Sequence, residues 1–92
     1  MENGLPKIEI TGELEITSAI YDHLEKKLTQ KIGRLGQIQS LHFILNPSVN
    51  GIYRVKGIIR RAGKEYCHEL EGRDMYDALS NLVNKLHEQI TA

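Results

Sequence analysis

The strongest constraint on the fold of this chain is an amphipathic stripe near its C-terminus. Asp74 belongs to the residue types that begin helices, and apolar side chains then recur at helical spacing as far as Ile90. The stripe comprises Met75, Ala78, Leu79, Leu82, Val83, Leu86 and Ile90. A helix with one apolar stripe buries it against another element. The upstream sequence must therefore supply an apolar surface on which this helix lies.

That surface is expected from four stretches in which apolar and polar residues alternate, as they do in half-buried strands. The stretches are residues 7–11, 40–46, 53–61 and 64–71. Ala62-Gly63 gives the last two the spacing of a hairpin with a tight turn, whereas Pro47 and Asn50-Gly51 indicate a loop before them. The alternation aligns the following residues on one face of the hairpin: Val55, Gly57 and Ile59 with Tyr66, His68 and Leu70.

A second amphipathic helix is expected between the first two strands. Thr17 suits its N-cap, and Gly33 and Gly36 end it. Its stripe comprises Ile20, Leu24 and Leu28 with Tyr21. The element order is then β-α-β-β-β-α, and both stripes are buried if the two helices cover one face of a four-stranded sheet. The sequence predicts an α+β two-layer sandwich that forms a single domain over residues 1–92.

The charges are segregated along the chain, although the formal net charge is zero. Residues 1–25 carry six acids, Glu2 among them, against one base, and residues 65–92 carry six acids against two bases. Residues 26–64 carry nine bases and no carboxylate. The neutral total therefore hides a basic middle, which a net charge does not report.

The expected topology gathers these charges at opposite ends of the molecule. The first two strands should be parallel, joined by a right-handed crossover, so both helices end beside the Ala62-Gly63 turn. We name this end the basic pole; it comprises Lys26, Lys27, Lys31, Arg34, Arg60, Arg61, Lys64 and Lys85. The opposite, acidic pole comprises Glu13, Glu15, Asp22, Glu71, Asp74 and Asp77. Helix macrodipoles account for the charges on the helices but not for three bases on a hairpin, so we interpret the basic pole as a binding surface rather than a feature of solubility alone.

Catalytic and metal-binding patterns are not found in the sequence. Cys67 and His68 are adjacent on a strand, so their side chains point to opposite faces and cannot share a metal. Cys67 lies between two glutamates, with no base to activate it as a nucleophile. We expect no enzymatic activity, no metal, no cofactor and no small-molecule substrate. No apolar run approaches membrane-spanning length, and a single cysteine is typical of a reducing cytosol.

The four histidines are expected to be packed or solvated rather than functional. His68 should be a hydrogen-bonded core residue, and His42 should face outward on the other side of the sheet. His23 and His87 fall on polar helix faces, where a solvated side chain is favoured.

Residues 71–90, EGRDMYDALSNLVNKLHEQI, resemble the signature of the bacterial ribosome hibernation factors. This family includes hibernation-promoting factor and the ribosome-associated inhibitor, and it also bears a sigma-factor modulation name. Ile-x-Ile-Thr at 8–11 and Glu-Ile-Thr-x-Ala-Ile at 15–20 agree with the pattern, and the resemblance covers nearly the whole chain. By this comparison we expect a short form, without a C-terminal dimerisation domain or an acidic tail.

The resemblance implies a cytoplasmic protein made in stationary phase or stress that silences translation. Such proteins bind the small ribosomal subunit near the decoding centre, where they overlap the tRNA and mRNA sites and contact ribosomal RNA phosphates through basic side chains. Lys27 and Lys85 match positions where family members carry bases, whereas Lys31 stands where they usually carry a buried leucine. Either the first helix slips in register there, or Lys31 extends to the basic pole.

Two other functions remain open at this point. The older family name suggests a protein-interaction module that modulates transcription. A sheet backed by two helices also resembles a generic double-stranded RNA-binding domain. Binding measurements distinguish the three functions. A hibernation factor should bind small ribosomal subunits, a generic RNA-binding domain should bind any duplex RNA, and a transcription module should be indifferent to RNA.

Overall fold

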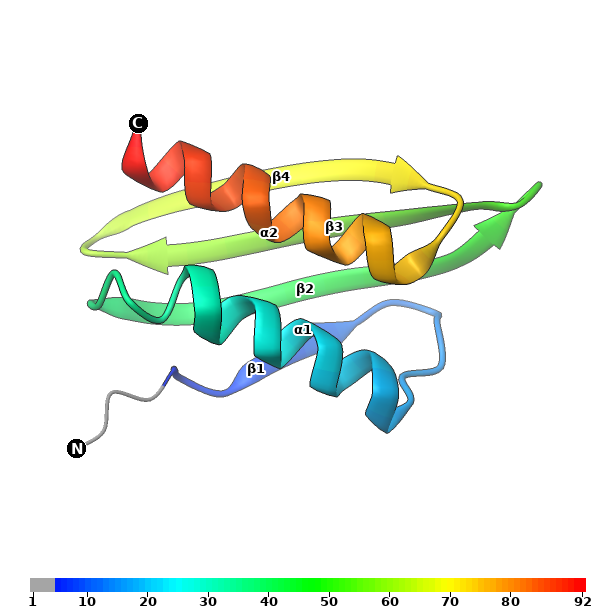
Figure 1. The fold of residues 1–92 in the computed structure, drawn as a ribbon, viewed down its shortest axis with the longest axis horizontal. Coiled ribbons are helices and arrows are strands. Elements are labelled where there is room, and N and C mark those ends of the chain that lie inside the picture. Colours follow the sequence, from blue (N-terminus) through cyan, green and yellow to red (C-terminus); the bar gives the residue numbers. More distant parts are fainter. Residues whose placement is uncertain (1–4) are drawn as a thin grey trace.

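The computed structural model describes residues 5–92, so Glu2, counted above among the acids, lies outside the described part of the chain. The elements follow the expected order β1-α1-β2-β3-β4-α2 (Figure 1). Their bounds are β1 Ile8–Thr11, α1 Ser18–Lys31, β2 Ile38–Val49, β3 Ile52–Arg61, β4 Lys64–Gly72 and α2 Met75–Thr91.

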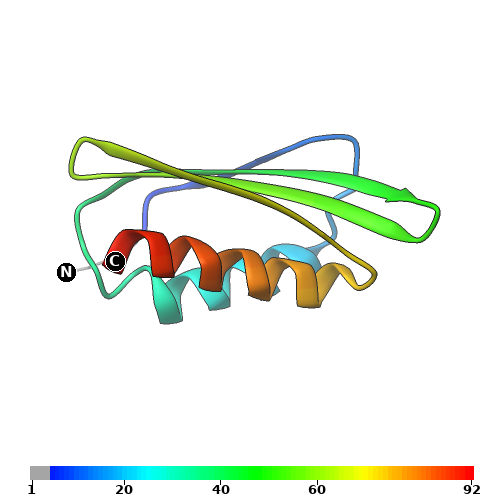
Figure 2. The same ribbon diagram turned by 90° about the horizontal axis from the view of Figure 1, so that it is seen from above.

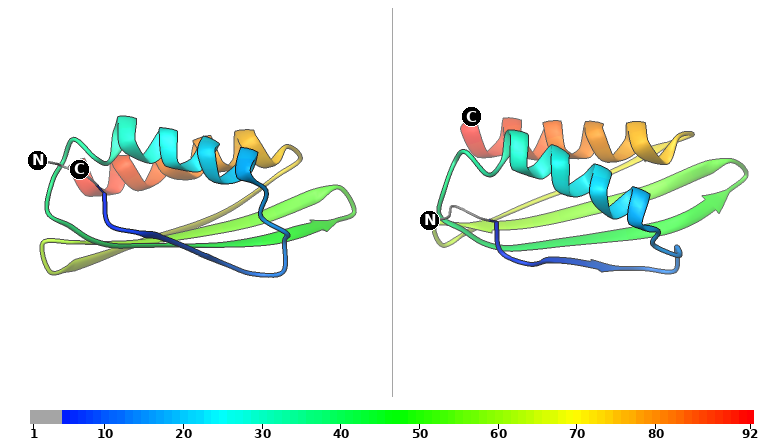
Figure 3. Two further views of the ribbon diagram at one scale, coloured as in Figure 1. Left: turned by 90° about the horizontal axis from the view of Figure 1, so that it is seen from below. Right: turned by 60° about the horizontal axis from the view of Figure 1, so that its bottom comes forward.

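The four strands form one sheet in the order β1-β2-β3-β4. β1 is parallel to β2, and the other two pairs are antiparallel. Figure 2 and both views in Figure 3 show the two helices together on one face of this sheet, with the other face uncovered by any helix. The expected α+β two-layer sandwich is therefore confirmed.

Local side-chain chemistry begins both helices where the sequence predicts. The Ile20 N–H donates to Oγ1 of Thr17 at 3.2 Å, which caps α1. The Asp74 carboxylate accepts from the N–H groups of Tyr76 and Asp77 at 2.8 and 3.1 Å, which caps α2. Each cap satisfies N–H groups that have no partner inside the helix.

The end of α1 distinguishes between the two alternatives for Lys31, a slip in helical register or a side chain that extends to the basic pole. The Ile32 N–H still donates to the Leu28 carbonyl at 2.7 Å, so the helical register continues without a slip. Ile32 follows Leu28 at a spacing of four residues and is fully buried, while Lys31 is exposed. Lys31 therefore extends into solvent at the basic pole, and Ile32 completes the apolar stripe.

The connection from β2 to β3 differs from the expected loop. β2 continues through Pro47 to Val49, and Asn50 and Gly51 form a tight turn with φ angles of 57° and 80°. Pro47 is tolerated because the register shifts there: two residues of β2 lie between Asn46 and Val49, opposite a single residue of β3. A β-bulge thus holds the proline inside the strand. The expected turn at Asn50-Gly51 is present, whereas the expectation that the loop begins at Pro47 was wrong.

The hairpin of β3 and β4 forms as the sequence predicts. Its turn residues Ala62 and Gly63 have φ angles of 51° and 81°, the positive values that a two-residue turn of this hand requires. The register pairs Gly57 with His68, Val55 with Leu70 and Ile59 with Tyr66. The predicted facing set, Val55, Gly57 and Ile59 with Tyr66, His68 and Leu70, is confirmed.

Gly57 makes room for the core beneath α2. A Cβ atom built at this position would lie 2.7 Å from Cε2 of Phe43 and 2.8 Å from Cδ1 of Leu86, closer than real contacts allow. Phe43 and Leu86 are both fully buried. The missing side chain in the centre of β3 therefore lets the sheet and α2 pack closely.

Gly57→Val should lower the free energy of unfolding by about 1–3 kcal/mol, because the new methyl groups overpack the contact between Phe43 and Leu86. Urea denaturation measures the change. Lys56→Val, one residue away on the other face of β3, is the matched control and should cost much less. Equal unfolding midpoints for wild type and Gly57→Val would contradict this packing.

Candidate nucleic-acid interface

The fold brings the residues of the basic pole to one end of the molecule. α1 and α2 run side by side in the same direction, so their C-terminal ends both lie at the end that carries the β3–β4 turn (Figure 1). Arg34 follows α1 at this end, and Lys64 begins β4 beside the turn. The gathering expected from topology is therefore present, whereas contact with RNA remains a prediction.

Two of the eight bases form ion pairs with carboxylates. Nη1 of Arg60 lies 3.4 Å from Oε1 of Glu65, and Nζ of Lys85 lies 3.8 Å from Oε1 of Glu88. All four side chains are more than half exposed, at 53–66%. Such exposed pairs are weak, so both bases can exchange their carboxylate for a phosphate.

Arg61 has a structural partner that its position in the sequence does not reveal. Its guanidinium donates to the Gly36 carbonyl from Nε and to the Leu35 carbonyl from Nη2, each at 3.0 Å. A backbone bond from the Ala62 N–H to the Gln37 carbonyl, at 3.2 Å, ties the same two segments together. Arg61 therefore fastens the loop after α1 to the β3–β4 turn and positions the bases on both.

The five remaining bases of the pole have no ion pair with a carboxylate among residues 5–92. They are Lys26, Lys27, Lys31, Arg34 and Lys64. All except Lys27, which is half-buried, have exposed side chains. These five side chains contribute the unpaired positive charge that the pole presents to solvent.

A hollow of about 550 Å³ lies between the last turns of the two helices. We name it the helix-end hollow; it is lined by Gln30, Lys31, Arg34, Leu35 and His87. His87 is half-buried there, so the sequence-based expectation of a solvated side chain was wrong. The sequence contained a signal for this partial burial: His87 follows Ser80 by seven residues, and Ser80 also faces α1.

His23 is also packed rather than solvated, which corrects a second expectation. Nε2 of His23 lies 3.1 Å from the Tyr76 carbonyl and 3.0 Å from Oγ of Ser80. The rings of His23 and Tyr76 meet edge to face, with centroids 5.1 Å apart. This contact joins the beginnings of α1 and α2, and it orients the two helices that carry the basic pole.

Arg54 lies away from the basic pole, as expected, and is engaged with the acids of β4. Its Nη2 lies 2.6 Å from Oε2 of Glu71, and its Nε lies 4.0 Å from Oε2 of Glu69. The hydrogen bond to Glu71 and the two negative charges raise the pKa of Arg54 above its ordinary value. Arg54 is therefore a permanent cation that neutralises part of the acidic side.

Cys67 and His68 lie on opposite faces of β4, as the sequence predicts. Cys67 is exposed on the face without helices. His68 is half-buried rather than a core residue, and Gln89 of α2 approaches its Nδ1 at 3.3 Å. On the open face, Nε2 of His42 lies 2.9 Å from Oγ1 of Thr11. Within residues 5–92, no three metal-binding side chains gather to hold an ion.

Cys67→Ser should leave RNA binding by the basic pole unchanged, because the thiol is exposed on the face opposite the helices. A filter-binding titration with RNA measures the effect. Cys67→Ala is the matched control, since it also removes the thiol without adding a hydroxyl. A loss of RNA binding in both variants, with the fold intact, would show that the thiol has a role.

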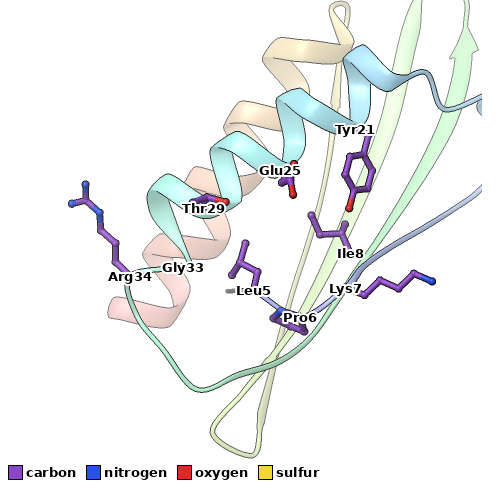
Figure 4. Close-up of a pocket in the computed structure, with 9 residues that line it drawn as sticks. All are labelled: Leu5, Pro6, Lys7, Ile8, Tyr21, Glu25, Thr29, Gly33 and Arg34. Atoms are coloured by element: carbon purple, nitrogen blue, oxygen red, sulfur yellow. The ribbon is translucent and has the colours of Figure 1, made fainter. Parts of the chain in front are cut away.

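A second hollow, of about 470 Å³, lies between the start of β1 and the outer side of α1 (Figure 4). Leu5, Ile8 and Tyr21 line it with apolar surface, and Glu25 contributes a carboxylate. Lys7 and Arg34 also border it, and Figure 4 shows their charged ends extending away from it in different directions. An apolar lining with a carboxylate does not suit a phosphate group, so the helix-end hollow is the better anion site. No helix within the described range combines the length and apolar character needed to cross a bilayer.

Comparison with known proteins places this geometry in a family. Residues 8–92 match the Ribosomal_S30AE family, described as Sigma 54 modulation protein / S30EA ribosomal protein. A curated relative from Haemophilus influenzae, ribosome-associated factor Y, is 34% identical over 79 residues. That alignment covers 85% of this chain and 72% of the relative.

Two solved structures share the fold over nearly their whole length. A ribosomal subunit interface protein from Coxiella burnetii superposes with a TM-score of 0.81 at 25% identity, covering 91% of this chain and 92% of that one. The N-terminal domain of Protein Y from Thermus thermophilus superposes with a TM-score of 0.78 at 28% identity, covering 89% and 91%. The family expected from the sequence is confirmed.

Proposed function

Because this chain belongs to the Sigma 54 modulation protein / S30EA ribosomal protein family, we propose that it is a ribosome hibernation factor that acts through its basic pole. The observation that carries the proposal is the gathering of five bases without a carboxylate partner, among the described residues, at one end of a two-layer fold. The relatives named for ribosome association and for the ribosomal subunit interface support a ribosomal partner.

The physical basis of binding is the exchange of counterions for side chains on ribosomal RNA. Each lysine or arginine that neutralises a phosphate releases a condensed cation, and this release favours the complex. The acidic pole lies at the opposite end, where Glu13, Glu15 and Asp77 repel RNA. The molecule therefore approaches RNA with the helix ends and the β3–β4 turn first.

The proposed site is the small subunit near the decoding centre. A domain with principal extents of 41 × 27 × 18 Å that occupies this place leaves no room for tRNA and mRNA, and translation stops without any chemical step. The protein acts in the cytoplasm, in stationary phase or under stress. No enzymatic activity and no cofactor are required for this role.

Sedimentation of the purified chain with ribosomal subunits in a sucrose gradient tests the proposal. We expect the chain to travel with the small subunit and to be released as the salt concentration rises, because the contacts are electrostatic. Equal binding to any duplex RNA would favour a generic RNA-binding domain. Failure to bind either, together with salt-independent binding to a sigma factor, would favour the transcription role.

A further inference from the structure

The helix-end hollow has the donor chemistry of an anion site. Lys31, Arg34 and His87 bring nitrogen donors to it from α1, the loop after α1, and α2. Gln30 adds a side-chain amide, and no carboxylate is among the residues that line it. A group with several acceptor oxygens, such as phosphate, can accept from all of these donors at once.

The surroundings of His87 are mainly basic. Lys31 and Arg34 face it across the hollow, and Arg61 of β3 holds the loop on the far side through the Leu35 carbonyl. The nearest acid along its own helix is Glu88, which pairs with Lys85 at 3.8 Å. On the sheet side of α2, Nε2 of Gln89 lies 3.3 Å from Nδ1 of His68 of β4.

The loop carbonyls do not oppose an anion in this hollow. The Leu35 and Gly36 carbonyls accept hydrogen bonds from the Arg61 guanidinium, which neutralises their negative ends. The Ile32 and Gly33 N–H groups both donate to the Leu28 carbonyl, at 2.7 and 2.8 Å, which satisfies a carbonyl near the end of α1. The adverse dipole at the end of α1 is thereby reduced.

We propose that the helix-end hollow binds a single backbone phosphate of a nucleic acid, and that His87 makes this contact stronger as the pH falls. A backbone phosphodiester keeps one negative charge between about pH 5 and 8, the range in which histidine side chains gain a proton. A bound phosphate and a protonated imidazole stabilise each other. The inference rests on the proposed function, since it assigns one contact within the basic pole.

Nuclear magnetic resonance of the histidine rings tests the site without the ribosome. A short single-stranded RNA is added to the labelled chain at about pH 6 and at about pH 8. We expect the His87 signals to shift at the lower pH and much less at the higher, while the His42 signals stay in place on the open face of the sheet. Lys31→Gln combined with Arg34→Gln should abolish the shift.

A nucleoside 5′-diphosphate is the second probe, because its phosphates present the same oxygens without a nucleic-acid backbone. We expect it to shift the same His87 signals, because the hollow would recognise phosphate oxygens rather than the bases. A shift with the diphosphate and none with RNA would overturn the assignment to a nucleic acid. Unchanged His87 signals with both probes would overturn the site itself.

Binding to small subunits supplies the functional measurement. Wild type should bind about threefold or more tightly at about pH 6 than at about pH 8, and His87→Asn should lose this difference. His42→Asn is the matched control and should keep it. If His87→Asn retains the full pH dependence while binding persists, the role of His87 is refuted and the proposed function stands. If neither the wild type nor any variant binds subunits, the proposed function fails. The histidine ring signals measured with RNA then test independently whether the hollow binds phosphate.

Discussion

Leu82→Ala is expected to lower the free energy of unfolding by about 2–5 kcal/mol, because the cavity it leaves in the centre of α2 cannot be refilled. Leu82 is fully buried among the sheet and helix side chains of the core. A domain of this size has about 5–15 kcal/mol in total, so the loss is a large share. Thermal unfolding followed by circular dichroism should show a midpoint lower by about 10 °C or more.

Leu24→Ala tests the packing of α1 in the same way, since Leu24 is also fully buried. Asn81→Ala is the matched control: it lies beside Leu82 on the exposed side of α2 and should change the midpoint little. Near-normal unfolding of both leucine variants would mean that the helices are not packed on the sheet as described.

Neutralising three bases of the pole together should weaken binding to small subunits and flatten its salt dependence by about two units on logarithmic axes. The variant is Lys26→Gln, Lys27→Gln and Lys64→Gln, all outside the helix-end hollow. Glutamine keeps most of each side-chain stem, so the change removes charge with little loss of packing. A salt titration of subunit binding measures both the affinity and the slope.

The acidic pole provides a control with the same number of neutralised charges. Glu13→Gln, Glu15→Gln and Asp77→Asn should leave binding unchanged or slightly tighter, with an unchanged slope, because these exposed carboxylates only repel phosphate. Two results would place the RNA contacts elsewhere: equal losses of affinity in the two triple variants, or a salt dependence that is the same in the basic triple variant as in wild type. Arg54 and Lys56 on the open face of the sheet would then be the next candidates.

Element order and helix starts follow from the sequence alone, because their causes are local. Thr17 and Asp74 cap helices through bonds to N–H groups two or three residues away. The alternation of β3 and β4 predicts their register, since a slip of one residue would turn every apolar side chain outward. The prediction that β2 ends before Pro47 was wrong because β2 forms a bulge against β3 at this point. The bulge accommodates a proline that a regular strand disfavours.

The location of the basic pole also follows from the sequence, since charge order and crossover handedness are enough to place it. Which of its side chains remain available does not follow, because their partners are far away along the chain. Arg61 binds carbonyls 25 and 26 residues distant, and His23 contacts α2 across 53 and 57 residues. The helix-end hollow likewise exists only where α1 and α2 end side by side. Periodicity reports which face of an element is buried, but packing between distant segments determines which charged and imidazole groups meet there.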